Sequence, residues 1–203
     1  TEEDIADMKA NNVPNWYIES CQKIKYLFPK AHAAAYVMQA FRIAYFKVYY
    51  PKAYYAAYFT VRASDDFDYE CMCKGIDVAK AAIREIQAKG QDATAKDKSK
   101  QTVLESIVEF YARGFQFEPI DLYRSQASKF TVTESGLLPP FSSMQGLGVT
   151  AAESIVAARE SGGEFHTIEE LKARTSLGRS LIDMLKENGV LQGIPETNQL
   201  SLF

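Results

Sequence analysis

The feature that most constrains the fold is the step Gly146-Leu147-Gly148, which stands directly before a run with apolar side chains at helical spacing. Two glycines around one apolar residue let the backbone turn tightly, because glycine reaches torsion angles that other residues avoid. Leu147 would anchor this turn in a core. The amides in the first turn of the next helix, starting at Val149, would then point outward.

The whole pattern from Phe141 to Val156 is typical of a helix-hairpin-helix element. Outward amides hold phosphate oxygens without help from Lys or Arg, and such contacts carry no sequence information. A degenerate second copy follows around Gly178, and it could serve packing instead. An ordinary glycine-rich link between helices is the alternative for the first copy. We expect DNA contacts at Gly146, Leu147, Gly148, Val149 and Gly178.

The remaining periodicity predicts a mainly α fold with a small β component (α+β). Residues 2–12 are typical of a short polar helix. Apolar residues at helical spacing predict further helices over 16–28, 31–48, 52–61, 71–88, 102–112, 149–160, 167–174 and 179–188. Alternating segments predict short strands over 115–117, 120–122 and 130–132. Polar residues predict an exposed loop over 89–99. The helix over 31–48 is apolar almost all round, which predicts burial inside a larger body.

Charge is distributed unevenly and suggests how the chain is divided. Seven Lys and Arg face one acid between Trp16 and Ala63, whereas residues 64–78 are acidic. The net charge of −3 argues against nucleic-acid binding by bulk attraction, so such binding must come from local arrangement. We expect four parts: a helical portion over 1–63, a helical connector with strands over 64–137, paired hairpins over 138–192 and a free tail over 193–203.

Composition also bears on location. No run of 18 uncharged apolar residues exists, which argues against a membrane span, and the opening Thr-Glu-Glu-Asp lacks the features of a signal peptide. Three cysteines form a sparse, odd set, so we expect a reducing, cytoplasmic environment. The missing initiator Met fits a fragment of a longer protein, or processing.

Lys30 and His32, two side chains that can carry a positive charge, lie at the start of the apolar helix predicted over 31–48. Together with the helix N-terminus they make a candidate phosphate site. A histidine satisfied within a core is an equally good interpretation of His32. Most aromatic residues in this part of the chain are expected to pack in a core rather than to stack on bases.

The chain ends in Gln199-Leu200-Ser201-Leu202-Phe203. A polar amide followed by spaced apolar residues suits an extended peptide that fills an apolar pocket on a partner. The alternative is a tail that folds back onto its own domain.

No catalytic or metal-binding pattern is evident. Cys71 and Cys73 have no second cysteine pair or nearby histidine, which argues against zinc. The acidic segment from Asp65 to Asp68 is better explained as a loop that caps a helix than as a metal site. Nucleophile triads, phosphate-binding glycine loops and dinucleotide fingerprints are absent from the sequence.

At these same residues the chain resembles the C-terminal part of the alpha subunit of bacterial replicative DNA polymerase III, PolC type. The segment from Lys23 to Tyr36, which contains the sequence Phe-Pro-Lys-Ala-His, resembles the fingers of that family. The paired hairpins resemble its duplex-binding module. The terminal Gln-Leu-Ser-Leu-Phe resembles its sliding-clamp-binding peptide.

The resemblance implies a role in DNA replication as part of a DNA-directed DNA polymerase, a nucleotidyltransferase. It places Lys30 and His32 near the incoming dNTP, the hairpins on primer-template duplex, and Gln199, Leu200, Leu202 and Phe203 on the β sliding clamp. It also implies Mg²⁺ in the complete enzyme, held by palm carboxylates that have no counterpart here, so the chain alone should be inactive.

Two other classes of function remain as alternatives. A non-catalytic DNA-binding or repair protein could also carry paired hairpins, but it would have no reason for the fingers-like segment. A clamp-interacting adaptor could present the tail alone.

Overall fold

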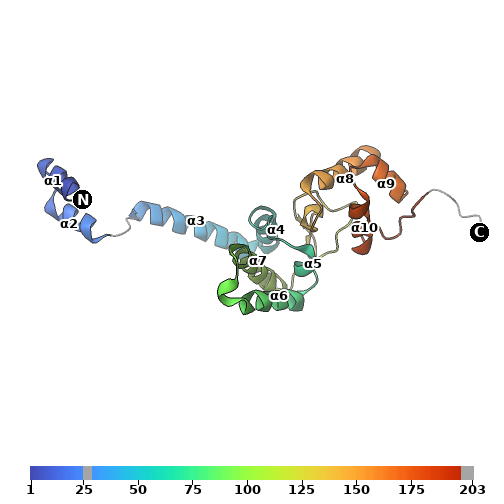
Figure 1. Ribbon diagram of the computed structural model, residues 1–203, viewed down its shortest axis with the longest axis horizontal. Coiled ribbons are helices and arrows are strands. Elements are labelled where there is room, and N and C mark those ends of the chain that lie inside the picture. Colours follow the sequence, from blue (N-terminus) through green and yellow to red (C-terminus); the bar gives the residue numbers. More distant parts are fainter. Residues whose placement is uncertain (25–28, 198–203) are drawn as a thin grey trace, which may run out of the picture. The chain divides into compact units, whose positions relative to one another are not determined.

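The computed structural model describes residues 1–24 and 29–197, which form two compact units, Thr1–Tyr45 and Phe46–Phe203. Helices dominate both units, and a three-stranded sheet belongs to the second (Figure 1). The predicted mainly helical fold class is confirmed. None of the helices within the described ranges is long and apolar enough to cross a membrane.

The first unit contains α1 (Glu2–Ala10), α2 (Asn15–Lys23) and most of α3 (Lys30–Tyr49), which continues into the second unit. Thr1 and Asp4 form a capping box that starts α1. The second predicted helix is confirmed as far as Lys23, and its end falls on residues 25–28, outside the described part.

Helix α3 is found where the sequence predicted it, but its predicted burial is wrong for this chain. None of its residues is buried. Tyr36 is 67% exposed and Phe41 is 74% exposed. The apolar periodicity identified a helix correctly, whereas burial requires a surface that other elements of this chain do not supply.

The second unit begins with α4 (Pro51–Val61), α5 (Tyr69–Met72), α6 (Ile76–Ala88), the 3₁₀ turn η1 (Gly90–Asp92) and α7 (Ala95–Ala112). Helices α6 and α7 pack against each other (Figure 1). Their core with α4 is rich in rings that stack edge to face, including Tyr55, Phe59, Phe67 and Phe110.

Two predictions for this region were wrong. The single helix expected over 71–88 is interrupted at Gly75, whose φ of 114° is open to glycine but strained for other residues. The loop expected over 89–99 is partly helical, because Thr94 and Asp97 form a capping box that starts α7 seven residues early.

The sheet has the order β1-β3-β2, with β1 (Gln116–Phe117) parallel and β2 (Thr131–Val132) antiparallel to β3 (Gly136–Leu138). A Cβ on Gly136 would lie 2.0 Å from the Gln116 carbonyl oxygen, so only glycine fits there.

Two of the three predicted strands are therefore confirmed, and β3 was missed. The strand expected over 120–122 is wrong, because Ile120 and Leu122 are buried in a loop. The alternation of apolar and polar residues over 120–122 comes from a loop in which every second side chain is buried.

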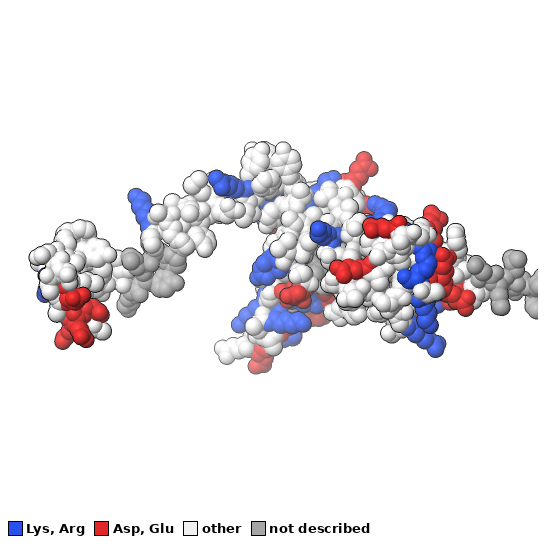
Figure 2. Space-filling view, turned by 90° about the horizontal axis from the view of Figure 1, so that it is seen from above, with Lys and Arg blue, Asp and Glu red and all other residues white. Residues whose placement is uncertain are grey.

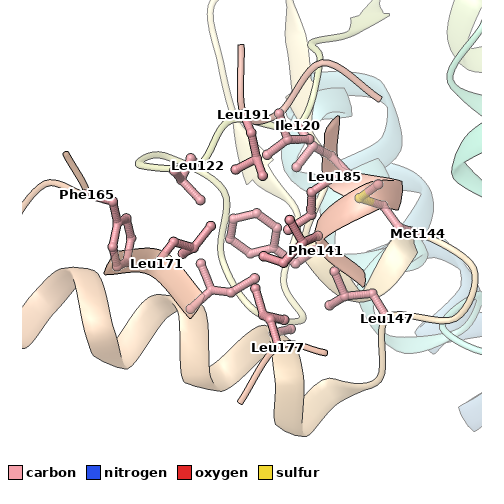
Figure 3. Packing of buried hydrophobic residues seen from close by; sticks show 14 of the residues in the cluster. Ile120, Leu122, Phe141, Met144, Leu147, Phe165, Leu171, Leu177, Leu185 and Leu191 are labelled. Atoms are coloured by element: carbon pink, nitrogen blue, oxygen red, sulfur yellow. The ribbon is translucent and has the colours of Figure 1, made fainter. Parts of the chain in front are cut away.

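A second core joins the 3₁₀ turn η2 (Phe141–Ser143) to α8 (Val149–Gly162), α9 (Ile168–Arg174) and α10 (Arg179–Glu187). Phe141 is fully buried and lies among leucines from several of these elements (Figure 3). This core holds the two hairpins together.

Residues that follow α10 are anchored on this core. The carbonyls of Pro195 and Glu196 accept hydrogen bonds from Ile168 N and Glu169 N, at 2.9 and 3.1 Å. Ile194 packs against the core. The prediction of a free tail from residue 193 is therefore wrong up to Glu196, and residues 198–203 lie outside the described part.

Candidate nucleic-acid interface

The first predicted hairpin turn is held by Leu147, which is 2% exposed, and by a hydrogen bond of 3.1 Å from its amide to the Met144 carbonyl. Gly146 has φ +87°, a left-handed conformation that disfavours any side chain. Gly148 has φ −66° and ψ 159°, which any residue adopts. The turn itself therefore requires only the first of the two glycines.

Gly148 is the N-cap of α8. No side chain caps this helix, and a Cβ added to Gly148 would meet nothing within 4 Å. The first helical hydrogen bond runs from Ala152 N to the Gly148 carbonyl, at 3.0 Å. The amides of Val149, Thr150 and Ala151 consequently have no acceptor within the helix.

The second hairpin repeats this arrangement. Leu177 is buried, and Gly178 is the N-cap of α10 with φ −75° and ψ 167°. Again no side chain caps the helix and a Cβ would meet nothing within 4 Å. Where the first hairpin has Gly146, the second has Ser176, whose amide donates to Ser154 Oγ of α8 at 3.2 Å. The degenerate copy thus keeps the open N-terminus and replaces the flexible turn with a contact to the first hairpin.

Side chains satisfy the N-termini of some other described helices, whereas α2 and α4 have neither a side-chain cap nor an acid in the first turn. Thr94 and Asp97 cap α7, and Thr167 caps α9 with Glu169 and Glu170 in its first turn. Helices α8 and α10 have no acidic residue in the first turn. Because acidic side chains there would neutralise the positive end of the helix dipole, α8 and α10 keep it available for an external anion.

The surroundings of the first hairpin combine apolar and polar side chains. A depression of about 290 Å³ borders Gly148 and Val149, and its other sides are lined by Phe59, Phe67 and Phe130 and by polar residues that include Ser64, Asp65, Ser128 and Lys129. On the face shown in Figure 2, acidic and basic side chains alternate over the second unit without forming a continuous basic surface. Attraction of a polyanion would therefore depend on amides and individual lysines, as the net charge indicates.

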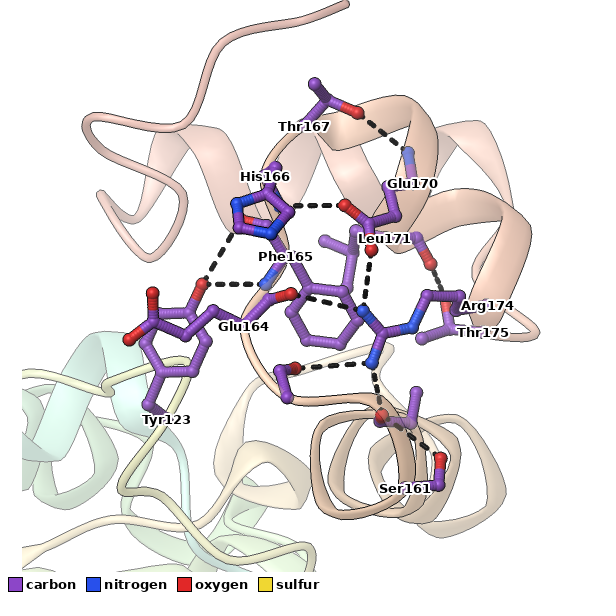
Figure 4. A network of polar contacts seen from close by, with 12 residues as sticks. Tyr123, Ser161, Glu164, Phe165, His166, Thr167, Glu170, Leu171, Arg174 and Thr175 are labelled. Carbon is purple, nitrogen blue, oxygen red and sulfur yellow. Dashed lines mark hydrogen bonds and ion pairs between the residues drawn. The ribbon is translucent and has the colours of Figure 1, made fainter. Parts of the chain in front are cut away.

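The two hairpins are joined by Arg174, a residue that sequence reasoning did not single out. Its guanidinium donates to the carbonyls of Ala158, Gly163 and Glu164 and to the Glu170 carboxylate, and it lies 4.4 Å from the Phe165 ring centroid (Figure 4). It thereby caps the end of α8 and ties it to α9. Only the tertiary structure shows this, because an arginine near a helix C-terminus is ordinary in sequence.

The carboxylate that Arg174 contacts belongs to the same network. The His166 amide donates to Glu170 at 2.9 Å, and this bond and the Arg174 hydrogen bond lower the pKa of Glu170. Glu170 therefore stays charged at neutral pH and keeps Arg174 in place.

Lys30 and His32 lie in the first turn of α3, and both are exposed. The His32 ring lies 4.5 Å from the Tyr36 ring between centroids. The alternative of a histidine buried in a core is therefore wrong for this chain. A role in nucleotide contact stays a prediction, and so does the role of Gln199, Leu200, Leu202 and Phe203, which lie outside the described residues.

Within residues 1–24 and 29–197, no three His, Cys, Asp or Glu side chains converge to hold an ion. Cys21, Cys71 and Cys73 are free thiols. Burial raises the pKa of the Cys73 thiol well above its usual value, which keeps it protonated and unreactive.

Residues 114–200 match the family model described as a helix-hairpin-helix motif. The chain is 56% identical over 203 residues to the DNA polymerase III PolC-type of Caldanaerobacter subterraneus subsp. tengcongensis, and 53% identical over 197 residues to that of Bacillus subtilis. It is 51% identical over 203 residues to that of Clostridium perfringens.

These matches cover 100%, 97% and 100% of this chain, which spans about 14% of the length of each relative. The helix-hairpin-helix prediction and the predicted resemblance are confirmed. Over its whole length, the chain is a relative of one segment of the PolC-type DNA polymerase III proteins.

Proposed function

We propose that this chain is a DNA-binding segment of a replicative DNA polymerase of the PolC type, and that it holds primer-template duplex through the N-termini of α8 and α10. The observation that supports this most is the pair of glycine-capped helices, each without a side-chain cap or an acid in its first turn. Phosphate oxygens would accept from the free amides next to Gly148 and Gly178. Because these contacts go to phosphates, they position duplex without reading its sequence.

The test is duplex binding by variants of the two N-caps. Gly148→Val places a side chain in the open space where a phosphate would approach, at a backbone conformation that valine accepts. We expect fluorescence anisotropy to show an affinity for primer-template about tenfold lower, equivalent to about one charge-assisted hydrogen bond, and unchanged sequence preference. Gly178→Val should act in the same direction.

A matched control is Ala88→Val, which adds similar volume at an exposed position at the end of α6. It should leave affinity unchanged. Equal affinities of wild type and folded Gly148→Val would show that the hairpin only packs.

Lys30 and His32 are proposed to contact the triphosphate of the incoming dNTP. Their exposure in the first turn of α3 supports this, because a cationic side chain and helix amides there would share the phosphates. Lys30→Met should weaken dNTP binding, and Lys30→Arg should preserve most of it. Identical dNTP binding by wild type and Lys30→Met would remove this role.

The described residues do not fit the Mg²⁺ of a polymerase, since no three carboxylate, histidine or cysteine side chains converge. The chain by itself is therefore proposed to be unable to extend a primer. A primer-extension assay with Mg²⁺ and all four dNTPs should show no product. Contaminant-free extension would show that the chain has a catalytic centre of its own.

The terminal peptide is proposed to bind the β sliding clamp through Gln199, Leu200, Leu202 and Phe203. Burial of two apolar side chains contributes roughly 3 to 6 kcal/mol before ordering costs, so the affinity of the isolated peptide should be modest. Attachment to the same duplex would make clamp binding effectively intramolecular. Calorimetry of the peptide against purified clamp should lose its signal in Leu202→Ala/Phe203→Ala, and equal heats would contradict the assignment.

A further inference from the structure

A side-chain hydrogen bond, called the tether below, links the turn of the first hairpin to a distant part of the chain. Gln145 precedes Gly146 in the turn, and its Nε2 donates to Asp68 Oδ2 at 3.2 Å. Asp68 lies 77 residues earlier in the chain, at the start of α5. The contact therefore joins the phosphate-binding turn to a different core of the second unit.

Asp68 is a well-held acceptor. It is the N-cap of α5, where its side chain accepts from Cys71 N at 3.4 Å, and Lys100 of α7 donates to its Oδ2 at 2.8 Å. Its residue is 9% exposed. Burial disfavours the charged form of Lys100, but the hydrogen bond and charge of Asp68 outweigh it and raise the pKa of Lys100.

The turn benefits from such a tether. Leu147 fixes it from the core side, while Gly146, with φ +87°, has few backbone restraints of its own. Gln145 and Gly146 line one side of a depression whose other side is formed by the 65–68 loop and by Lys96 and Lys100. Asp68 can therefore restrain the outer side of the turn.

We propose that Asp68, held by Lys100, is a positioning residue that keeps the hairpin in its phosphate-binding geometry through Gln145. This inference rests on the proposed duplex binding by the hairpin. It makes the acidic 65–68 loop a support for DNA contact, although its charge alone would repel a phosphate. Neither Asp68 nor Lys100 is required to touch DNA.

The experiment exchanges donor and acceptor. Gln145→Leu removes the hydrogen bond without adding charge and should lower duplex affinity about two- to tenfold. Gln145→Glu places a carboxylate against Asp68 and should lower it further. The double variant Asp68→Asn/Gln145→Glu restores one amide-carboxylate hydrogen bond in the reverse direction, so it should recover most of the affinity that Gln145→Glu loses.

A matched control separates positioning from bulk charge. Asp66 lines the same depression but accepts from Ser99 Oγ, at 2.6 Å, and not from Gln145. Asp66→Asn/Gln145→Glu and Asp68→Asn/Gln145→Glu both keep the net charge at −3. We expect recovery only in the Asp68 double variant, together with restored hydrogen-exchange protection of the Leu147 amide, which donates to the Met144 carbonyl in the turn.

The outcomes are distinct. Equal recovery in both double variants, or none in either, would overturn the positioning role while leaving duplex binding intact. Failure of the wild-type chain to bind duplex would instead remove the proposed function on which the inference rests.

Discussion

Helix α3 is more apolar than the three C-terminal helices, yet it is the less buried of the two regions. Helix α3 has 20 residues, is strongly apolar and has no buried residue. Helices α8, α9 and α10 are shorter and have a larger share of polar residues, yet each has side chains that are fully or almost fully buried, such as Ile155, Leu171 and Leu185. Apolar composition therefore does not by itself decide where a helix is buried.

The reason is that the hydrophobic effect acts on area removed from water, and removal needs a complementary surface. Around Phe141, short helices and loops provide that surface to one another (Figure 3). Most helical stability in proteins comes from such packing rather than from propensity. The two regions should accordingly respond differently to the same substitution.

The largest difference is expected for Phe141→Ala and Phe41→Ala. Phe141 is fully buried, so its truncation leaves a cavity and should lower the free energy of unfolding by about 3–5 kcal/mol. Phe41 is 74% exposed, and its truncation should change it by less than about 0.5 kcal/mol. Urea unfolding followed by circular dichroism measures both, and equal losses would contradict the contrast.

A smaller difference is expected for Arg174→Lys and Arg42→Lys. Lysine cannot reproduce the planar guanidinium that donates to three carbonyls and to the Glu170 carboxylate. The first change should therefore lower the free energy of unfolding by about 1–3 kcal/mol. Arg42 is exposed on α3, and its replacement should be nearly neutral. The same unfolding measurement applies, and a neutral Arg174→Lys would mean that the network in Figure 4 adds little to stability.

Within the packed region, the two hairpin glycines should differ as well. Gly146→Ala forces a side chain into the left-handed region and should cost about 1–2 kcal/mol. Gly148→Ala adds a Cβ in open space at an ordinary backbone conformation and should have little effect on unfolding. Thermal unfolding would distinguish a glycine that the turn requires from one that leaves room for a ligand. Equal shifts in Tm would contradict the distinction.

The smallest effect is expected at the start of α8 and has the opposite sign. Thr150→Glu adds a negative charge to an uncapped first turn and should stabilise the chain by about 0.3–1 kcal/mol through the helix dipole. The same charge should weaken duplex binding. Thr150→Gln, similar in size but uncharged, should do neither. Stability and affinity that rise together in Thr150→Glu would contradict an anion site at this N-terminus.

Local patterns in the sequence determined much of this protein. Leu147 with its flanking glycines was sufficient for the hairpin, and apolar spacing located the main helices, because each depends on residues a few positions apart. The Thr94-Asp97 capping box at the start of α7 is equally local, since its two residues are three positions apart. Of the site residues, Gly146, Leu147, Gly148, Val149 and Gly178 lie in the hairpins where they were predicted.

Tertiary structure alone decided the features that depend on distant residues. The burial of Ile120 without a strand, the pairing of Gly136 with Gln116, and the exposure of α3 each depend on which surfaces meet. The tether from Gln145 to Asp68 spans 77 residues and leaves no periodic trace. Sequence periodicity reports how one segment could bury a face, whereas the identity of the surface that covers it arises only when the chain packs.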